Sequence, residues 1–120
     1  MAVRAVRGAT QVEWDDRELI LEAIAELVHA VLERNDLTTE EVVSVIFTAT
    51  PDLRAEFPAY AARAAGISDV PMLCATEIDV PGAMPRVLRL LAHVETERSR
   101  HDLKHVYLRG AAALRTDLPK

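Results

Sequence analysis

The fold of this chain is decided by residues 15–36, which read DDRELILEAIAELVHAVLERND. We predict that Asp15 caps a helix here and that Glu18 reaches back to it in a capping box. Asn35 and Asp36 end the helix. Apolar residues recur along it at the three-and-four spacing of one face: Leu19, Ile20, Ala23, Ile24, Leu27, Val28, Val31 and Leu32. So long an apolar stripe needs a flat surface to cover, and a β-sheet is the simplest one.

Segments rich in β-branched and aliphatic residues surround this helix and supply the sheet. Residues 42–50 are apolar on both faces of a strand, and residues 87–95 alternate in a way that favours a strand over a helix. A short Ala-rich helix over residues 58–65 closes at Gly66. The five expected strands cover residues 3–12, 42–50, 70–74, 87–95 and 105–109. This order predicts an α+β fold, a mixed five-stranded sheet with one long helix and short helices.

One helix cannot cover both faces of a five-stranded sheet. The apolar character of both faces of residues 42–50 and 87–94 nevertheless predicts that the second face is buried as well. We therefore expect the sheet to pack against the sheets of other subunits, in an assembly of closed cyclic symmetry. The 120 residues suffice for one such domain, residues 1–120, and not for two.

Composition excludes several classes of function. A formal net charge of −5 argues against nonspecific nucleic-acid binding, which needs a basic surface. No apolar run approaches the roughly 18 residues that span a bilayer, so no membrane partner is expected. Arg4 and Arg7 interrupt any N-terminal signal sequence, and a single cysteine excludes an internal disulfide and a cysteine-based metal cage. We expect a cytoplasmic protein.

Arginine dominates the basic residues. Of the 14, only Lys104 and Lys120 are lysines and 12 are arginines. The planar guanidinium can bind a carboxylate through two parallel hydrogen bonds, so the skew suits an anionic ligand, although the composition of the host genome would produce the same skew. In a strand, Arg4 and Arg7 fall on opposite faces, so the two need not share a role. Gly8 marks a bulge or a close backbone approach.

Residues 73–89 carry the candidate site. This segment leaves an apolar run, crosses a Pro-Gly turn and brings the thiol of Cys74, the carboxylate of Glu77 and the guanidinium of Arg89 to strand ends. An ordinary loop with a surface Glu and a surface Arg would show the same spacing. No metal-binding histidine pair, P-loop or nucleophile elbow accompanies it, and Cys74 has no evident base, which favours an inert thiol over a nucleophile. The set suits binding an anionic organic molecule better than acid–base or covalent chemistry.

Five segments, taken in order, resemble the small trimeric, monofunctional chorismate mutases of the kind represented in Bacillus. Together they span essentially the whole chain, and they are specific only as a set. They are Val6-Arg7-Gly8-Ala9-Thr10; Ala49-Thr50-Pro51-Asp52-Leu53 with Phe57-Pro58-Ala59; Cys74 with Glu77; Arg89; and His105-Val106-Tyr107-Leu108 with Leu114-Arg115-Thr116-Asp117-Leu118.

The resemblance implies a fold in which three mixed sheets pack around a threefold axis as a pseudo-α/β-barrel, similar to that of the RidA proteins. It implies a homotrimer with active sites at the subunit interfaces and no cofactor or metal. The substrate would be the dianion chorismate, rearranged to prephenate in the biosynthesis of phenylalanine and tyrosine.

The resemblance also implies roles for individual residues. The catalytic groups would be Arg89 at the ether oxygen, Glu77 at the ring hydroxyl and Arg7 at the enolpyruvyl carboxylate. Tyr107 would donate to a carboxylate, and Cys74 would flank the ring hydroxyl. The remaining contacts would come from Leu73, Ala75, Thr76, Leu114 and Arg115, and from Phe57 and Arg63 of a neighbouring subunit.

Three departures from the family concern the entrance to the site. The family usually has a lysine where this chain has Tyr60 and a small polar residue where it has Leu73, and the C-terminal tail is short. Two alternatives stay open: a trimeric enamine/imine deaminase of the RidA kind, and a non-catalytic ligand-binding trimer. The pairing of Glu77 with Arg89, together with Arg7, favours the mutase.

Overall fold

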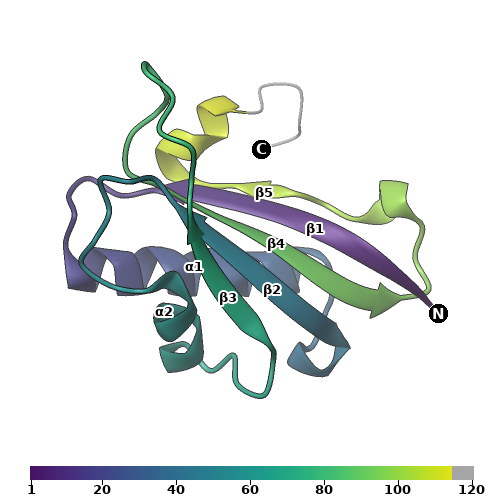
Figure 1. Cartoon of the computed structure of the whole chain (residues 1–120). Helices are drawn as coiled ribbons and strands as arrows, with labels where there is room; N and C mark the ends of the chain where they lie inside the picture. The colour runs from purple at the N-terminus through teal and green to yellow at the C-terminus, as the bar shows by residue number, and fades with distance from the viewer. Residues whose placement is uncertain (115–120) are drawn as a thin grey trace.

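The computed structural model describes residues 1–114 and places five strands in one mixed sheet (Figure 1). The sheet order is β3-β2-β4-β1-β5. Strand β4 runs antiparallel to both β1 and β2, whereas β3 is parallel to β2 and β5 is parallel to β1. The predicted α+β fold with a mixed five-stranded sheet is confirmed. The strands are β1 (Ala2–Gln11), β2 (Val42–Ala49), β3 (Met72–Thr76), β4 (Val87–Thr96) and β5 (Val106–Tyr107).

Helix α1 (Arg17–Arg34) begins one residue later than the sequence predicts. Its cap is Asp16, whose carboxylate accepts a hydrogen bond from the backbone N–H of Leu19 at 3.1 Å. The expected cap at Asp15 and the capping box at Glu18 are wrong. Asp15 instead accepts hydrogen bonds from the backbone N–H groups of Arg54 and Ala55, each at 2.9 Å, and so ties this turn to the segment that precedes the short helix.

The apolar face of α1 packs on the sheet as the periodicity predicts. Ile20, Ile24 and Leu27 are fully buried. The closest approach is at Gly8 of β1, where an added Cβ would lie 3.1 Å from Cδ1 of Leu27 and 3.3 Å from Cγ of Leu90. Gly8 therefore marks a close approach of helix to strand and not a bulge, because a side chain there would crowd Leu27 and Leu90.

Short helices complete the fold. Helix α2 (Pro58–Ala64) starts with proline and closes at Gly66, whose φ of +102° suits glycine. Single 3₁₀ turns form η1 (Thr39–Glu41) and η2 (Arg100–Asp102), and a longer 3₁₀ segment forms η3 (Arg109–Leu114). Within residues 1–114, no helix combines the length and the apolar character that crossing a membrane requires.

Two predicted strands have limits that differ from the structure by two or more residues, whereas the other three differ by one residue. The third was expected over residues 70–74 but pairs over Met72–Thr76, because Asp69 adopts a φ of +59° and Pro71 has no N–H to donate. The last was expected over residues 105–109, yet only Val106 and Tyr107 pair with β1. Arg109 has a φ of +53°, which turns the chain into η3.

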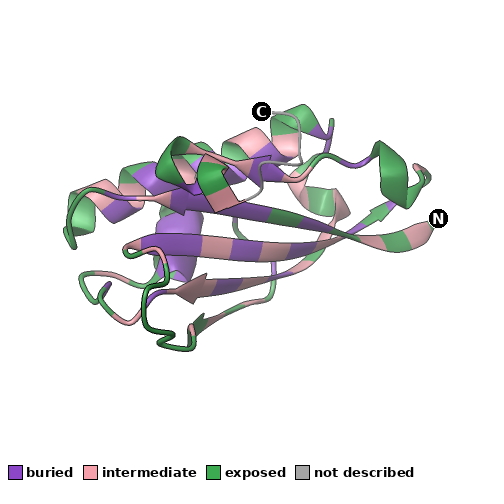
Figure 2. Cartoon of the chain, turned by 90° about the horizontal axis from the view of Figure 1, so that it is seen from above, coloured by how far each residue is buried: buried purple, intermediate pink, exposed green. Residues whose placement is uncertain are grey.

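Helices α1 and α2 cover only one face of the sheet; in Figure 1 they lie behind it. Along β4, alternate residues such as Leu90 and Val94 are buried, while Arg89, Leu91 and His93 between them stay partly exposed, and Figure 2 shows the same alternation as purple bands along the strands. Large apolar side chains remain on the open face, among them Val3 at 58% exposure and Leu73 at 57%. The expectation that one sheet face lacks helices is confirmed.

Candidate active site

A row of side chains crosses the open face of the sheet at the level of Arg89. Residue pairing across the strands runs from Tyr107 to Ala9, from Ala9 to Arg89, and from Arg89 to Thr48. Directly paired residues project to the same face of a sheet. Arg7 lies two residues before Ala9 on β1 and therefore shares that face. The row forms what we call the arginine pocket, a hollow of about 290 Å³ lined by Arg7, Thr48, Arg89 and Tyr107 among others.

Glu77 lies beside this pocket, just after the end of β3, and lines a neighbouring hollow. Its backbone N–H donates to the carbonyl of Ala49 at 2.9 Å, which keeps the chain against β2 for one residue beyond the strand. One carboxylate oxygen, Oε2, then accepts from Nε of Arg89 at 2.9 Å and from the hydroxyl of Thr48 at 2.6 Å. The Glu77 side chain is 16% exposed and that of Arg89 is 42% exposed, so the ion pair is open to a ligand from the solvent side.

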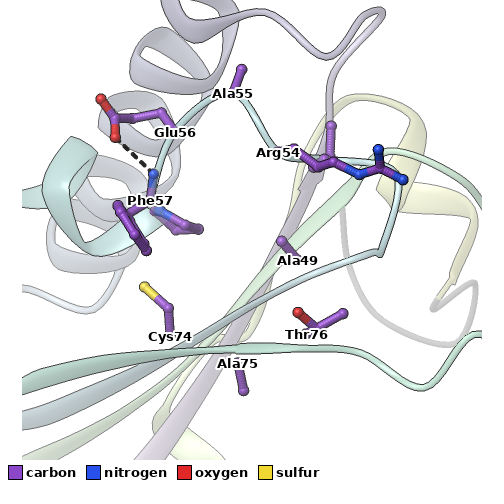
Figure 3. A pocket seen from close by; sticks show the side chains of 10 residues that line it. Ala49, Arg54, Ala55, Glu56, Phe57, Cys74, Ala75 and Thr76 are labelled. Atoms are coloured by element: carbon purple, nitrogen blue, oxygen red, sulfur yellow. Dashed lines mark hydrogen bonds between the residues drawn. The ribbon is translucent and has the colours of Figure 1, made fainter.

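A second hollow lies between β3 and the start of α2, and we call it the aromatic cleft (Figure 3). Its volume is about 320 Å³, and Phe57, Cys74 and Thr76 are among the residues that line it. Phe57 is 69% exposed, although it is one of only two phenylalanines in the chain. The thiol of Cys74 accepts the backbone N–H of Ala59 at 3.4 Å, which agrees with the inert role expected for it.

Within one chain, β3 separates the two hollows. Cys74 and Thr76 project toward α2, whereas Leu73 and Ala75 project to the open face, because successive side chains of a strand alternate. A third hollow of about 280 Å³, which both Arg54 and Arg89 line, continues along the strand ends.

The structure thus brings together part of the expected site. Arg7, Glu77, Arg89 and Tyr107 meet on the open face. Phe57 and Cys74 lie in the aromatic cleft instead, and Arg63 is exposed on α2 without lining either hollow. Leu114 is half-buried at the end of η3, and Arg115 lies outside the described residues.

Comparison with known proteins identifies the family. Residues 3–118 match the family model described as "Chorismate mutase type I". The chain belongs to the type I chorismate mutase family. It is 49% identical over 117 residues to "Chorismate mutase AroH" of Thermus thermophilus, covering 97% of this chain and 96% of that protein. It is 40% identical over 119 residues to "Chorismate mutase AroH" of Bacillus subtilis, covering 98% and 94%. The solved structure of a chorismate mutase from Clostridium thermocellum superposes with a TM-score of 0.89 at 41% identity, covering 91% of this chain and 97% of that one.

In this type I chorismate mutase, an arginine lies beside the position where the family usually carries a lysine. The guanidinium of Arg17 lies 5.6 Å from the ring centre of Tyr60 and forms an ion pair with Glu56 at 3.0 Å. The hydrogen bond with Glu56 raises the pKa of Arg17 above its ordinary value. A cation is therefore present near the aromatic cleft although residue 60 is not lysine.

The groups of this family member suit charge stabilisation better than proton transfer. Among the described residues, no three His, Cys, Asp or Glu side chains gather closely enough to hold a metal ion. His105 lies nearest to the arginines, and its Nδ1 accepts the backbone N–H of Arg7 at 3.0 Å. The arginine pocket presents two guanidinium groups, a phenol and a hydroxyl, and the carboxylate of Glu77 binds one of those guanidinium groups beside it.

Thr48 is the one polar residue of this cluster that the sequence did not point to. It lies within residues 42–50, which are otherwise so apolar that the segment indicates only a buried strand. A period-two count would have placed Ser44 and Thr48 on the same face, and pairing with residue 89 would then have brought Thr48 to the site.

Proposed function

We propose that this protein is a chorismate mutase that rearranges chorismate to prephenate. The observation that carries the proposal is the juxtaposition of Arg89, Glu77 and Arg7 on one sheet face, in a chain that belongs to the type I chorismate mutase family. Membership of that family also places the reaction in the biosynthesis of aromatic amino acids. It does not favour the alternative of a RidA-like deaminase, nor that of a non-catalytic trimer.

The chemistry explains why a site rich in cations would suffice without a general base. Chorismate is a dianion with an enolpyruvyl ether, and its rearrangement is an intramolecular pericyclic shift that transfers no proton. The enzyme must hold the diaxial, chair-like conformer and stabilise the charge that separates as the ether bond breaks. Preorganised donors aimed at developing charge are each worth roughly 3–4 kcal/mol in comparable sites.

Arg89 has the geometry for this task. Its Nε donates a hydrogen bond to Glu77, and this bond fixes the plane of the guanidinium. Within residues 1–114, no hydrogen bond reaches its Nη1 and Nη2 atoms. In our proposal these two nitrogens donate to the ether oxygen and to a substrate carboxylate, and the first of these bonds strengthens as negative charge grows.

The neighbouring groups hold the rest of the substrate. Arg7 binds the enolpyruvyl carboxylate, and Tyr107 donates to a carboxylate from the other end of the same row. Glu77 accepts from the ring hydroxyl and favours positive character in the ring. Leu73 and Ala75 bound the site on the β3 side. Leu114 and Arg115 are further proposed substrate contacts.

A homotrimer would complete the site, since one chain keeps its two hollows on opposite sides of β3. In our proposal the aromatic cleft of one subunit faces the arginine pocket of the next. Phe57 then packs on the substrate ring, and Arg63 attracts the dianion at the mouth. The exposure of Phe57, and the apolar side chains on the open sheet face, support this arrangement. We also propose a cytoplasmic location, on compositional grounds.

A direct assay tests the function. The purified protein should consume chorismate and form prephenate without an added metal or cofactor. An enamine or imine substrate that releases ammonia should be left unchanged. Failure to convert chorismate, with a folded protein, would contradict the proposal.

The pH dependence provides a second test. Because the reaction exchanges no proton with the enzyme, we expect kcat to be nearly constant between about pH 6 and 9. Initial rates at saturating chorismate across that range measure it. A bell-shaped profile with both limbs inside the range would indicate acid–base catalysis and support the deaminase.

A further inference from the structure

Thr48 occupies a central place between the two charged residues of the site. Its strand partners are Arg89 on β4 and Ala75 on β3, so its side chain stands on the open face between them. Glu77 follows β3 by one residue, and its backbone bond to Ala49 lets its side chain fold back over Thr48. Threonine is β-branched and has few rotamers in a strand, so the direction of its hydroxyl is well defined.

The hydroxyl and the guanidinium converge on the same atom. Thr48 Oγ1 donates to Oε2 of Glu77 at 2.6 Å, within the range of about 2.5–2.7 Å that marks a hydroxyl bonded to an ionised carboxylate. Nε of Arg89 donates to that oxygen at 2.9 Å. The described part of the chain offers no partner to the other oxygen, Oε1. Two donors from different directions hold the carboxylate in one orientation.

We propose that Thr48 is a positioning residue that reserves Oε1 of Glu77 and the terminal nitrogens of Arg89 for the substrate. This inference rests on the proposed mutase function. Without the hydroxyl, the carboxylate is free to turn and to take both parallel donors of Arg89, since the fork-to-fork pair is the preferred geometry of arginine with a carboxylate. That pair would occupy donors that the ether oxygen needs in the transition state.

Two substitutions separate this role from a structural one. Thr48→Val keeps the shape and the β-branch but removes the hydroxyl, and we expect kcat to fall about tenfold to a hundredfold while KM changes less than about threefold. Thr48→Ser keeps the hydroxyl and should retain kcat within about threefold. Ser44→Ala is the matched control, because it removes a hydroxyl from the same face of β2 that bonds to His93 instead. The control should behave like the wild type.

The outcomes distinguish the possible failures. A wild type that converts chorismate together with a Thr48→Val variant of equal kcat would overturn this inference and leave the proposed function intact. Equal losses in Thr48→Val and Thr48→Ser would also overturn it, because the hydroxyl would then not be the cause. A crystal structure of Thr48→Val checks the geometry without any assay. Arg89 should bind both oxygens of Glu77, and a pair still made through Oε2 alone would count against the inference even if the wild type were inactive on chorismate.

Discussion

At the scale of single residues, the arrangement makes Arg89 the group on which the reaction depends most. Arg89→Lys keeps a positive charge but replaces the planar fork by a compact ammonium of shorter reach, whose donors are not fixed in the plane set by Glu77. We expect kcat to fall about a hundredfold to a thousandfold, with a much smaller change in KM, because the lost contact is made chiefly in the transition state. Steady-state assays of prephenate formation measure both constants.

The control for this prediction is Arg100→Lys, which changes an exposed arginine of η2 outside both hollows. Both variants should unfold within about 1 kcal/mol of the wild type, because half-exposed ion pairs contribute little to stability. Near-normal turnover in a folded Arg89→Lys variant would remove Arg89 from the mechanism.

The sequence predicted the charged residues of the site better than their neighbours. Arg89 and Glu77 stand out because a charged side chain within an apolar strand, or just after one, needs an explanation. Thr48 does not stand out, since threonine is common in any strand, and only the register of β2 against β4 gives it a meaning. Residue type alone carries no information about register, so the sequence does not point to this hydroxyl.

At the scale of elements, two adjacent aspartates perform different tasks, and substitution should separate them. Asp16→Ala removes the cap of α1 and should lower the free energy of unfolding by about 1 kcal/mol without a change in activity. Asp15→Ala releases the backbone N–H groups of Arg54 and Ala55, which lie three and two residues before Phe57. We expect it to raise KM severalfold, because the segment that carries Phe57 loosens.

Thermal unfolding and steady-state kinetics on both variants check this pair. If Asp15→Ala destabilises the protein without raising KM, its turn does not position the aromatic cleft. If Asp16→Ala raises KM instead, the proposed division of roles between the two aspartates is wrong.

The same pair shows where element prediction from sequence is limited. Asp15 and Asp16 both fit the preferences of a helix cap, and the apolar stripe fixes which residues are helical but not which aspartate comes first. The C-terminal limit of β5 could not be predicted from the sequence either. Tyr107 and Arg109 satisfy the alternation equally well, but the positive φ of Arg109 depends on tertiary packing that no local pattern contains.

At the scale of the whole molecule, the sequence predicted that one face of the sheet lacks a helix. The chain contains one long amphipathic helix and strands that are apolar on both faces. Periodicity and composition did not predict how the residues of the site divide between two hollows; only the family resemblance implied that Phe57 lies apart from the arginines of its own chain. That division follows from β3 standing at the edge of the sheet, with Cys74 facing α2 and Leu73 facing away.

The open face of the sheet bears on the assembly of the protein. The wild type should sediment as a trimer, at three times the 13.3 kDa mass of one chain. Val3→Glu places a carboxylate on the open face, far along β1 from the arginine pocket and directly opposite Glu95. In a trimer each subunit would bury that unpaired charge, at an effective cost of several kcal/mol per ion. We therefore expect the variant to dissociate at assay concentrations and to lose activity, because Phe57 of one subunit no longer meets the arginines of the next.

Arg34→Glu is the matched control, since it also introduces a carboxylate but at an exposed position near the end of α1, on the other side of the sheet. It should remain trimeric and active. Sedimentation velocity beside the chorismate assay decides the matter: raising the concentration of Val3→Glu should restore assembly and activity together, because the two are linked by mass action. A wild type that is active as a stable monomer would show instead that one chain holds the whole site, and the proposed meeting of the aromatic cleft with a neighbour's arginine pocket would be wrong.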